Sequence, residues 1–566
     1  MKSRILSLAL CLIASGAASG QDEVDPRAAT LSGGPLIPEQ AAYDVLSYEL
    51  SVTVDPERQW LDGELTVEAR VLSPMDWLVL DLDPRMKVSK ITFGEDEAKW
   101  ERREDRIWIA LGETQPKDST LRATVIYAGE PRVAPNPPWS GGFTWSKTEA
   151  GAPWIAVSCQ LDGADLWWPC KDHPGDEPET MKLQVTIPEP LVCASNGRLV
   201  EVSDALEDGW HTYRWQIDNP INNYCVSLNI APYEVIEADY RSIAGETMPV
   251  IFWVLPEAKA KAQKLMPQIL KELRFFEETV GPYPFRSEKY GIAHTPYLGM
   301  EHQTIISYGA DFELNSSGFD WLHLHELAHE WWGNLVTNAD YKDFWIHEGL
   351  GTYMEVLAAE YFKGPEAGRG YTARLRFSIN NRAPIARREP TAIRNVYFVP
   401  PKYIASDNDV YYKAALVMHT LRYLIGDEAF RKTIRKMTYP TKALEKATDG
   451  SQCRFVTTAE FQDLAEEISG QDLGWFFELY LYQPDLPELI EVRTQGGVTL
   501  TWKTPEGLPF PMPVEVQVGK QTRRFEPDEQ GHMRVPLKSG SELTVDPGGW
   551  ILREMPRPRR ERGGRR

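Results

Sequence analysis

The chain has 566 residues, of which 42% are hydrophobic, 11% aromatic and 25% charged. This composition is typical of a folded globular protein and argues against a disordered or fibrous one, and the length predicts two to four domains. The formal net charge of −21 favours solubility and disfavours nucleic acid as a partner.

The first twenty residues have the pattern of a secretory signal peptide. Lys2 and Arg4 precede an apolar run over residues 5–13, which is too short to span a membrane, and small residues follow it. The alternative is a disordered N-terminus. We expect residues 1–20 to be removed on export to the periplasm or the extracellular space, with residues 21–40 as a leader arm and no membrane span.

The six cysteines do not form a regular framework. Cys11 lies in the signal segment, and the five that remain are an odd, sparse set without zinc-finger spacing. We therefore expect mostly buried thiols with at most one or two disulfides.

The residues after the leader arm predict a β-rich domain over residues 41–235. Residues 48–54 and 64–71 alternate apolar and polar side chains with period two, which is typical of strands with one buried face. Similar short segments return near the C-terminus and predict a small β-sandwich module over residues 476–552. The final stretch, residues 553–566, is rich in arginine, and we expect a solvated, disordered tail or a contact with an anionic surface.

The middle of the chain, residues 236–475, is mainly helical. Helical periodicity predicts helices at about 257–280, 319–332, 346–362, 411–425 and 458–468. The whole chain is therefore predicted to be a multidomain α+β protein, with an N-terminal antiparallel β domain, a mainly α domain and a C-terminal β module.

One of these helices carries the segment His325-Glu326-Leu327-Ala328-His329. Residues four apart lie on one face of a helix, so His325 and His329 can reach one metal ion while Glu326 leans over the same edge. Zinc in catalytic sites takes this kind of ligand set and leaves one position for water, whose proton Glu326 would accept. Asp320 is placed to cap the start of the helix, and Gly333-Asn334 to end it.

A third ligand is available in the next helix. Glu348 follows His329 by nineteen residues, so a helix–loop–helix can bring its carboxylate back to the two imidazoles. Two histidines and one glutamate are typical of a catalytic rather than a structural zinc site, with one Zn²⁺ per chain. Thr352 and Glu355 lie one and two turns further along the face of Glu348, and one of them could orient a ligand imidazole.

The segments HELAHEWWGN and WIHEGLGTYME resemble the aminopeptidase N and leukotriene hydrolase family of gluzincin zinc peptidases. The resemblance covers nearly the whole mature chain and implies a thermolysin-like catalytic domain. Many members carry a large C-terminal helical domain, and we expect no counterpart of it here, because only about twenty residues follow Asp546.

The family also has a Gly-x-Met-Glu-Asn stretch upstream of the zinc helix. Here Met300 and Glu301 match it, whereas Leu298 replaces the first glycine and His302 replaces the asparagine. The resemblance implies that Glu301 binds the free α-amino group of the substrate and that Met300 belongs to the substrate-binding site. An ammonium group needs a carboxylate partner in a dry cleft, and such an anchor makes an exopeptidase.

Two further positions follow from the resemblance. Tyr411, two residues before Lys413, stands at the position of the tyrosine that stabilises the oxyanion, although the neighbouring Tyr412 is the residue with which it could be confused. Gln160, ten residues before Cys170, matches the strand glutamine that helps to hold the amino end of the substrate.

These residues predict a zinc-dependent aminopeptidase that removes single residues from peptides with a free N-terminus. We considered three alternatives: a lipid epoxide hydrolase on the same site, as in one branch of the family, an endopeptidase, and a non-catalytic zinc-bearing binding protein. The side-chain preference, the biological substrate and the oligomeric state do not follow from the sequence.

Overall fold

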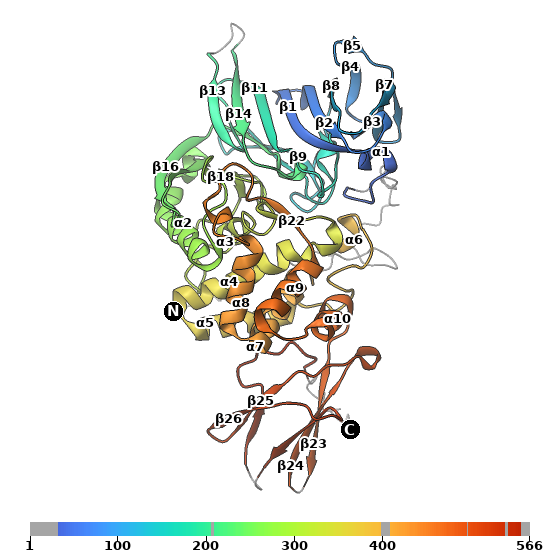
Figure 1. The fold of residues 1–566 in the computed structure, drawn as a ribbon. Helices are drawn as coiled ribbons and strands as arrows, with labels where there is room; N and C mark the ends of the chain where they lie inside the picture. The colour runs from blue at the N-terminus through green and yellow to red at the C-terminus, as the bar shows by residue number, and fades with distance from the viewer. Residues whose placement is uncertain (1–31, 205–208, 398–407, 495, 538–540, 556–566) are drawn as a thin grey trace, which may run out of the picture.

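The computed structural model describes residues 32–204, 209–397, 408–494, 496–537 and 541–555. It has β sheets at the N-terminal end, a mainly helical middle and further β sheets at the C-terminal end (Figure 1). This mixed architecture confirms the predicted α+β fold class. No helix in the described ranges is long and apolar enough to cross a membrane.

The N-terminal part consists of strands that bury alternate side chains. Tyr48, Leu50 and Val52 are each at most 2% exposed, as expected of a strand with one face in the core. The strands are β1 (Tyr43–Asp55), β2 (Trp60–Val71), β3 (Met75–Asp81), β4 (Lys87–Phe93), β5 (Asp96–Glu97), β6 (Trp100–Arg103), β7 (Arg106–Gln115), β8 (Thr120–Gly129), β9 (Gly142–Lys147), β10 (Pro153–Ser158), β11 (Thr180–Pro188), β12 (Val192–Ser195), β13 (Arg198–Val202), β14 (Trp210–Ile217) and β15 (Leu228–Ala231). A short helix, α1 (Pro38–Ala41), precedes them.

These strands form one eight-stranded sheet, in the order β13-β14-β11-β1-β2-β8-β4-β5, and two smaller ones, β12-β15-β10-β9 and β3-β7-β6. The predicted antiparallel pairing holds in the large sheet except between β1 and β11, which are parallel. The chain passes through the other sheets between these two strands, and a connection of that length permits a parallel pair. Strand β10 ends at Ser158, two residues before Gln160.

The middle part combines a sheet with a group of helices. The sheet has the order β16 (Glu234–Arg241), β17 (Thr247–Val254), β18 (Tyr290–His294), β20 (Ile306–Tyr308) and β19 (Gly299–Met300), and β21 (Val336–Asn338) pairs with β22 (Arg454–Val456). The helices are α2 (Lys259–Val280), α3 (Trp321–Ala328), α4 (Trp345–Lys363), α5 (Pro365–Leu375), α6 (Arg394–Tyr397), α7 (Tyr412–Ile425), α8 (Asp427–Thr438), α9 (Thr458–Ser469) and α10 (Gly474–Tyr482). Helices α2, α4, α7 and α9 agree with the predicted ranges to within two residues.

Helix α3 is shorter than the predicted range 319–332. Asp320 caps its start as expected, because its side chain accepts a hydrogen bond from the His323 amide at 3.0 Å. Its regular part ends at Ala328, so His329 is the capping residue rather than a residue of the helix interior. The His329 carbonyl then accepts from the Asn334 amide, five residues on, at 2.9 Å.

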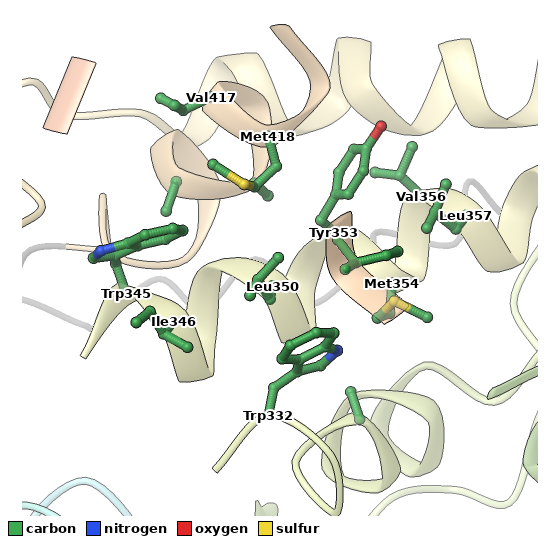
Figure 2. Close-up of a cluster of buried hydrophobic side chains, with 14 of the residues drawn as sticks. Trp332, Trp345, Ile346, Leu350, Tyr353, Met354, Val356, Leu357, Val417 and Met418 are labelled. Atoms are coloured by element: carbon green, nitrogen blue, oxygen red, sulfur yellow. The ribbon is translucent and has the colours of Figure 1, made fainter. Parts of the chain in front are cut away.

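Helix α4 crosses the hydrophobic core of the middle part. Figure 2 shows its side chains packed between Trp332, which follows α3, and Val417 and Met418 of α7. From Trp345 to Ala359 every residue of α4 is buried. A helix that is buried all round is held by packing on every side, so the glutamates that it carries have little freedom to move.

The C-terminal part contains two three-stranded sheets. They are made of β23 (Glu488–Thr494), β24 (Gly497–Lys503) and β27 (His532–Pro536), and of β26 (Gln521–Phe525), β25 (Val514–Val518) and β28 (Leu543–Val545). Trp550, after the last strand, stacks on His419 of α7 with ring centroids 4.4 Å apart. Tyr480 of α10 also donates to the Leu552 carbonyl at 2.6 Å, so the chain end is tied to the helices.

The predicted signal peptide (1–20) and most of the leader arm and the basic tail lie outside the described residues. The five cysteines of the described part are free thiols, four of them buried, in agreement with the expectation of mostly buried thiols.

Candidate metal centre and catalytic site

The three predicted metal ligands meet between α3 and α4. His325 lies in the last turn of α3, His329 caps it, and Glu348 lies in the first turn of α4. Glu348 Oε2 is 3.6 Å from His325 Nε2 and 3.4 Å from His329 Nε2. One ligand atom from each residue lies within 4.8 Å of the others, which is close enough for all three to bind one ion.

The surroundings of these residues fit a metal ion. His325 donates through Nδ1 to Glu355 Oε1 at 2.9 Å, and His329 donates through Nδ1 to the Trp332 carbonyl at 2.9 Å. Both Nε2 atoms are thus left for a ligand. Glu348 Oε2 is buried, and among the described residues it has no hydrogen-bond partner. A buried carboxylate oxygen that faces the Nε2 atoms of two imidazoles is a ligand set that suits Zn²⁺ with a fourth position open.

Of the two residues that were candidates to orient an imidazole, the structure selects Glu355. Its second carboxylate oxygen accepts a hydrogen bond from Tyr371 of α5, so both oxygens are engaged. Thr352 Oγ1 is buried without a hydrogen-bond partner in the described part of the chain. Tyr371 could not be anticipated from the sequence, since its contact depends on how α5 packs against α4.

Glu326 lies beside the metal ligands and is 6% exposed. Burial raises the pKa of Glu326 to about 8, with His325 opposing the rise and the Glu301 carboxylate adding to it. Gly299 of β19 approaches this carboxylate closely: a Cβ at that position would lie 2.3 Å from Glu326 Oε1. Only glycine therefore leaves room for Glu326 in this position.

Among the predicted substrate-binding residues, Gln160 and Glu301 form a hydrogen-bonded pair that reaches Glu348. Met300 is buried in β19, and Glu301, which follows it, is 3% exposed. Glu301 Oε1 accepts hydrogen bonds from Gln160 and, at 2.9 Å, from the Tyr224 hydroxyl. The Gln160 amide also lies 3.3 Å from Glu348 Oε1. Burial raises the pKa of Glu301. Tyr224 was not anticipated from the sequence.

Tyr411 immediately precedes α7, and its ring centroid is 6.1 Å from that of His325. Its hydroxyl lies 2.8 Å from the hydroxyl of Tyr397. Tyr412, the residue with which it could be confused, is the first residue of α7. Tyr397 was not anticipated either, because α6 is too short to leave a periodic pattern.

His302, which replaces the asparagine of the family stretch, is fully buried. Its Nδ1 lies 3.2 Å from Ser307 Oγ, and its Nε2 has no hydrogen-bond partner among the described residues. Burial lowers the pKa of His302 to about 3, so the imidazole is neutral at physiological pH.

The chain is similar to known peptidases over most of its length. The model described as the peptidase family M1 domain matches residues 271–480, and the model of the peptidase M1 N-terminal domain matches residues 45–225. Together the two models match more than half of the 566 residues.

Individual relatives agree with the family models. Aminopeptidase N of Haemonchus contortus is 25% identical over 475 residues, which are 75% of this chain and 46% of that protein. Leukotriene A-4 hydrolase of Xenopus laevis is 26% identical over 225 residues, which are 38% of this chain and 36% of that protein. The chain thus spans less than half the length of each of these two relatives.

A solved structure of an M1 zinc metallopeptidase from Deinococcus radiodurans, a mutant bound to a Tyr-Ser-Ala substrate, is similar to this fold. The TM-score is 0.63 and the sequence identity 26%, with 79% of this chain and 96% of that chain covered. The family models, these relatives and the two-histidine, one-glutamate centre all agree, and the chain belongs to the M1 family of peptidases.

Proposed function

We propose that this protein is a zinc-dependent aminopeptidase that removes one residue at a time from the free N-terminus of peptides. The observation that carries the proposal is the position of Gln160, whose amide contacts both Glu301 and Glu348. The predicted amine anchor is thereby one side chain away from a metal ligand. An N-terminal ammonium held there has its first peptide bond close to the metal centre, which is the geometry of an exopeptidase.

Each residue has a distinct task in the proposed reaction. Zinc held by the three ligands would supply a Lewis acid that polarises the substrate carbonyl and makes water more acidic. Glu326 accepts the proton of the attacking water and returns it to the leaving amine. Tyr411 donates a hydrogen bond to the oxyanion that develops on the carbonyl. Glu301 and Gln160 hold the substrate ammonium throughout.

The amine anchor also favours this function over the alternatives. A lipid epoxide carries no ammonium group, and an endopeptidase does not need a buried carboxylate to bind one. The relatives include both an aminopeptidase and a leukotriene hydrolase. A peptide with a free N-terminus and a lipid epoxide are therefore assayed side by side, and we expect turnover of the peptide.

The test is a comparison of free and N-acetylated peptides with purified, metal-quantified protein. We expect cleavage of the free peptides one residue at a time, loss of activity with a chelator and recovery with zinc. Glu326→Gln should lower kcat by a factor of at least about 100, since general acid–base catalysis contributes on that order. Equal rates on blocked and free peptides, or near-wild-type turnover by Glu326→Gln, would contradict the proposal.

We also propose that the protein acts after export. The support is the basic, apolar and small-residue order of residues 1–20. Sequencing the N-terminus of the protein from the culture medium or the periplasm checks this, and a mature form that still begins at Met1 would contradict it.

A further inference from the structure

Tyr397, the last residue of α6, is buried next to the catalytic residues but has no task in the reaction described above. Its ring packs edge-on against Phe344, with the ring centroids 5.9 Å apart. Only 6% of the surface of Tyr397 is exposed. Phe344 directly precedes α4. The ring of Tyr397 is therefore held by the start of the helix that supplies Glu348.

The hydroxyl of Tyr397 contacts three side chains of the site. It is 2.8 Å from the Tyr411 hydroxyl, 3.3 Å from Glu348 Oε1 and 3.5 Å from Gln160 Oε1. A phenol has a single proton, so Tyr397 donates to one of these three oxygens at a time; it can accept only from Tyr411, because Glu348 Oε1 and Gln160 Oε1 have no hydrogen to give. The 2.8 Å contact to Tyr411 is the shortest of the three.

The direction of that contact matters for the proposed role of Tyr411. When Tyr411 donates its proton to the oxyanion, its oxygen is free to accept a hydrogen bond from another donor. Tyr397 is positioned to give that hydrogen bond. In a chain of hydrogen bonds each donor polarises the next, so donation by Tyr397 strengthens the hydrogen bond from Tyr411 to the oxyanion.

We propose that Tyr397 is a positioning residue for the oxyanion donor: its hydroxyl orients the Tyr411 phenol and turns its proton toward the substrate carbonyl. The inference rests on the proposed function, since it assumes that an oxyanion forms beside Tyr411. Removal of the Tyr397 hydroxyl should therefore slow the chemical step through its effect on Tyr411 and leave substrate binding unchanged.

The experiment is a double-mutant cycle with Tyr397→Phe and Tyr411→Phe on a chromogenic aminoacyl anilide. Phenylalanine at 397 keeps the ring that packs on Phe344 and removes only the hydroxyl. We expect Tyr397→Phe to lower kcat about tenfold, the value of one hydrogen bond, with KM within twofold of the wild type. In the Tyr411→Phe background the same substitution should have no further effect on kcat.

The matched control is Tyr361→Phe. Tyr361 is half-exposed and donates to Glu278 on the surface, so its kcat and KM should equal those of the wild type. Zinc content and Tm are measured for every variant, because a loss of zinc in Tyr397→Phe would assign the residue to the metal centre and overturn the inference.

Three kinetic outcomes also overturn it: an unchanged kcat, a raised KM at constant kcat, and a kcat loss that adds fully to that of Tyr411→Phe. The last two would place Tyr397 in substrate binding or in an independent role while leaving the aminopeptidase function standing. A wild-type protein without peptide turnover would instead contradict the proposed function, and this inference with it.

Discussion

His325 donates its Nδ1 hydrogen to Glu355 Oε1 across 2.9 Å, while Tyr371 donates to the other oxygen of the same carboxylate. The imidazole is thereby fixed in the tautomer that leaves Nε2 for the metal, and its ring cannot rotate without breaking this contact. Three successive helices, α3, α4 and α5, contribute one residue each to the arrangement. The orientation of the ligand His325 is therefore set by residues that are not themselves metal ligands.

The first prediction concerns this support. Glu355→Ala should lower the affinity for zinc by about 10- to 100-fold, because the outer partner of a ligand histidine contributes on that scale. Competition with a zinc chelator at fixed pH measures the change. Glu366→Ala is the control, since the Glu366 side chain is 84% exposed, and it should bind zinc as the wild type does. Equal affinities in all three proteins would contradict the supporting role of Glu355.

The second prediction concerns the close approach of Gly299 to Glu326. A Cβ at Gly299 would lie 2.3 Å from Glu326 Oε1, so the carboxylate must move in Gly299→Ala. We expect kcat to fall about 100-fold, which is the effect of displacing a catalytic group by about 1 Å. Steady-state kinetics on the free peptide measures it.

Gly370→Ala provides the control for that substitution. Gly370 lies in the exposed part of α5, and nothing lies within 4 Å of the position of its Cβ. Alanine there should leave kcat unchanged. It should raise the free energy of unfolding by about 0.4–1 kcal/mol, because alanine lowers the conformational entropy of the unfolded chain. If both alanine variants keep wild-type kcat, Glu326 does not depend on the space at Gly299.

The third prediction separates amine recognition from chemistry. Glu301→Gln keeps the shape of the side chain and removes its charge, so it should lower kcat/KM for a free peptide by about 100-fold, in line with the loss of a charge-assisted hydrogen bond. Any residual cleavage of the N-acetylated peptide should not change. Glu313→Gln, at an exposed position, is the control. A proportional loss on both substrates would mean that Glu301 does not recognise the amine.

The three metal ligands could be predicted as neighbours because regular structure sets their spacing, whereas Glu301, Gln160 and Tyr411 were placed only through the resemblance to the family. His325 and His329 are one helical turn apart, and Glu348 lies in the first turn of the next long helix. The sequence could not place Tyr224 or Tyr397, because each reaches the site from a segment without a periodic pattern. Tyr224 lies 77 residues before Glu301 in the chain, so only the packing of the N-terminal sheets against the middle part brings the two together.

The end of α3 could not be predicted for a related reason. The apolar and aromatic run after His329 is compatible with further helical turns, and it predicted a helix to residue 332. The structure instead closes a wide turn, in which the Asn334 amide donates to the His329 carbonyl. The Asn334 side chain is thereby placed to donate to the Glu301 carbonyl at 3.2 Å, a contact between distant segments that local preferences do not encode.

The last prediction concerns His302 and acid stability. Burial holds the pKa of His302 at about 3 in the folded protein, whereas a histidine in an unfolded chain has a pKa of about 6.5. Between these two values the unfolded state binds a proton that the folded state does not, so stability is lost as the pH falls below 6.5. At pH 5 the loss from this one residue is on the order of 2 kcal/mol.

His302→Asn removes that titration and places the residue of the family stretch at this position. The free energy of unfolding of the wild type minus that of the variant should therefore fall by about 2 kcal/mol between pH 7.5 and pH 5. Urea unfolding of both proteins at the same zinc concentration measures this difference. Loss of the imidazole's packing changes the free energy of unfolding of the variant equally at both pH values. The part of the difference that varies with pH therefore reports the protonation of His302. Parallel pH profiles would show that His302 takes up a proton in the folded protein as readily as in the unfolded chain, through Nε2, its atom without a hydrogen-bond partner among the described residues.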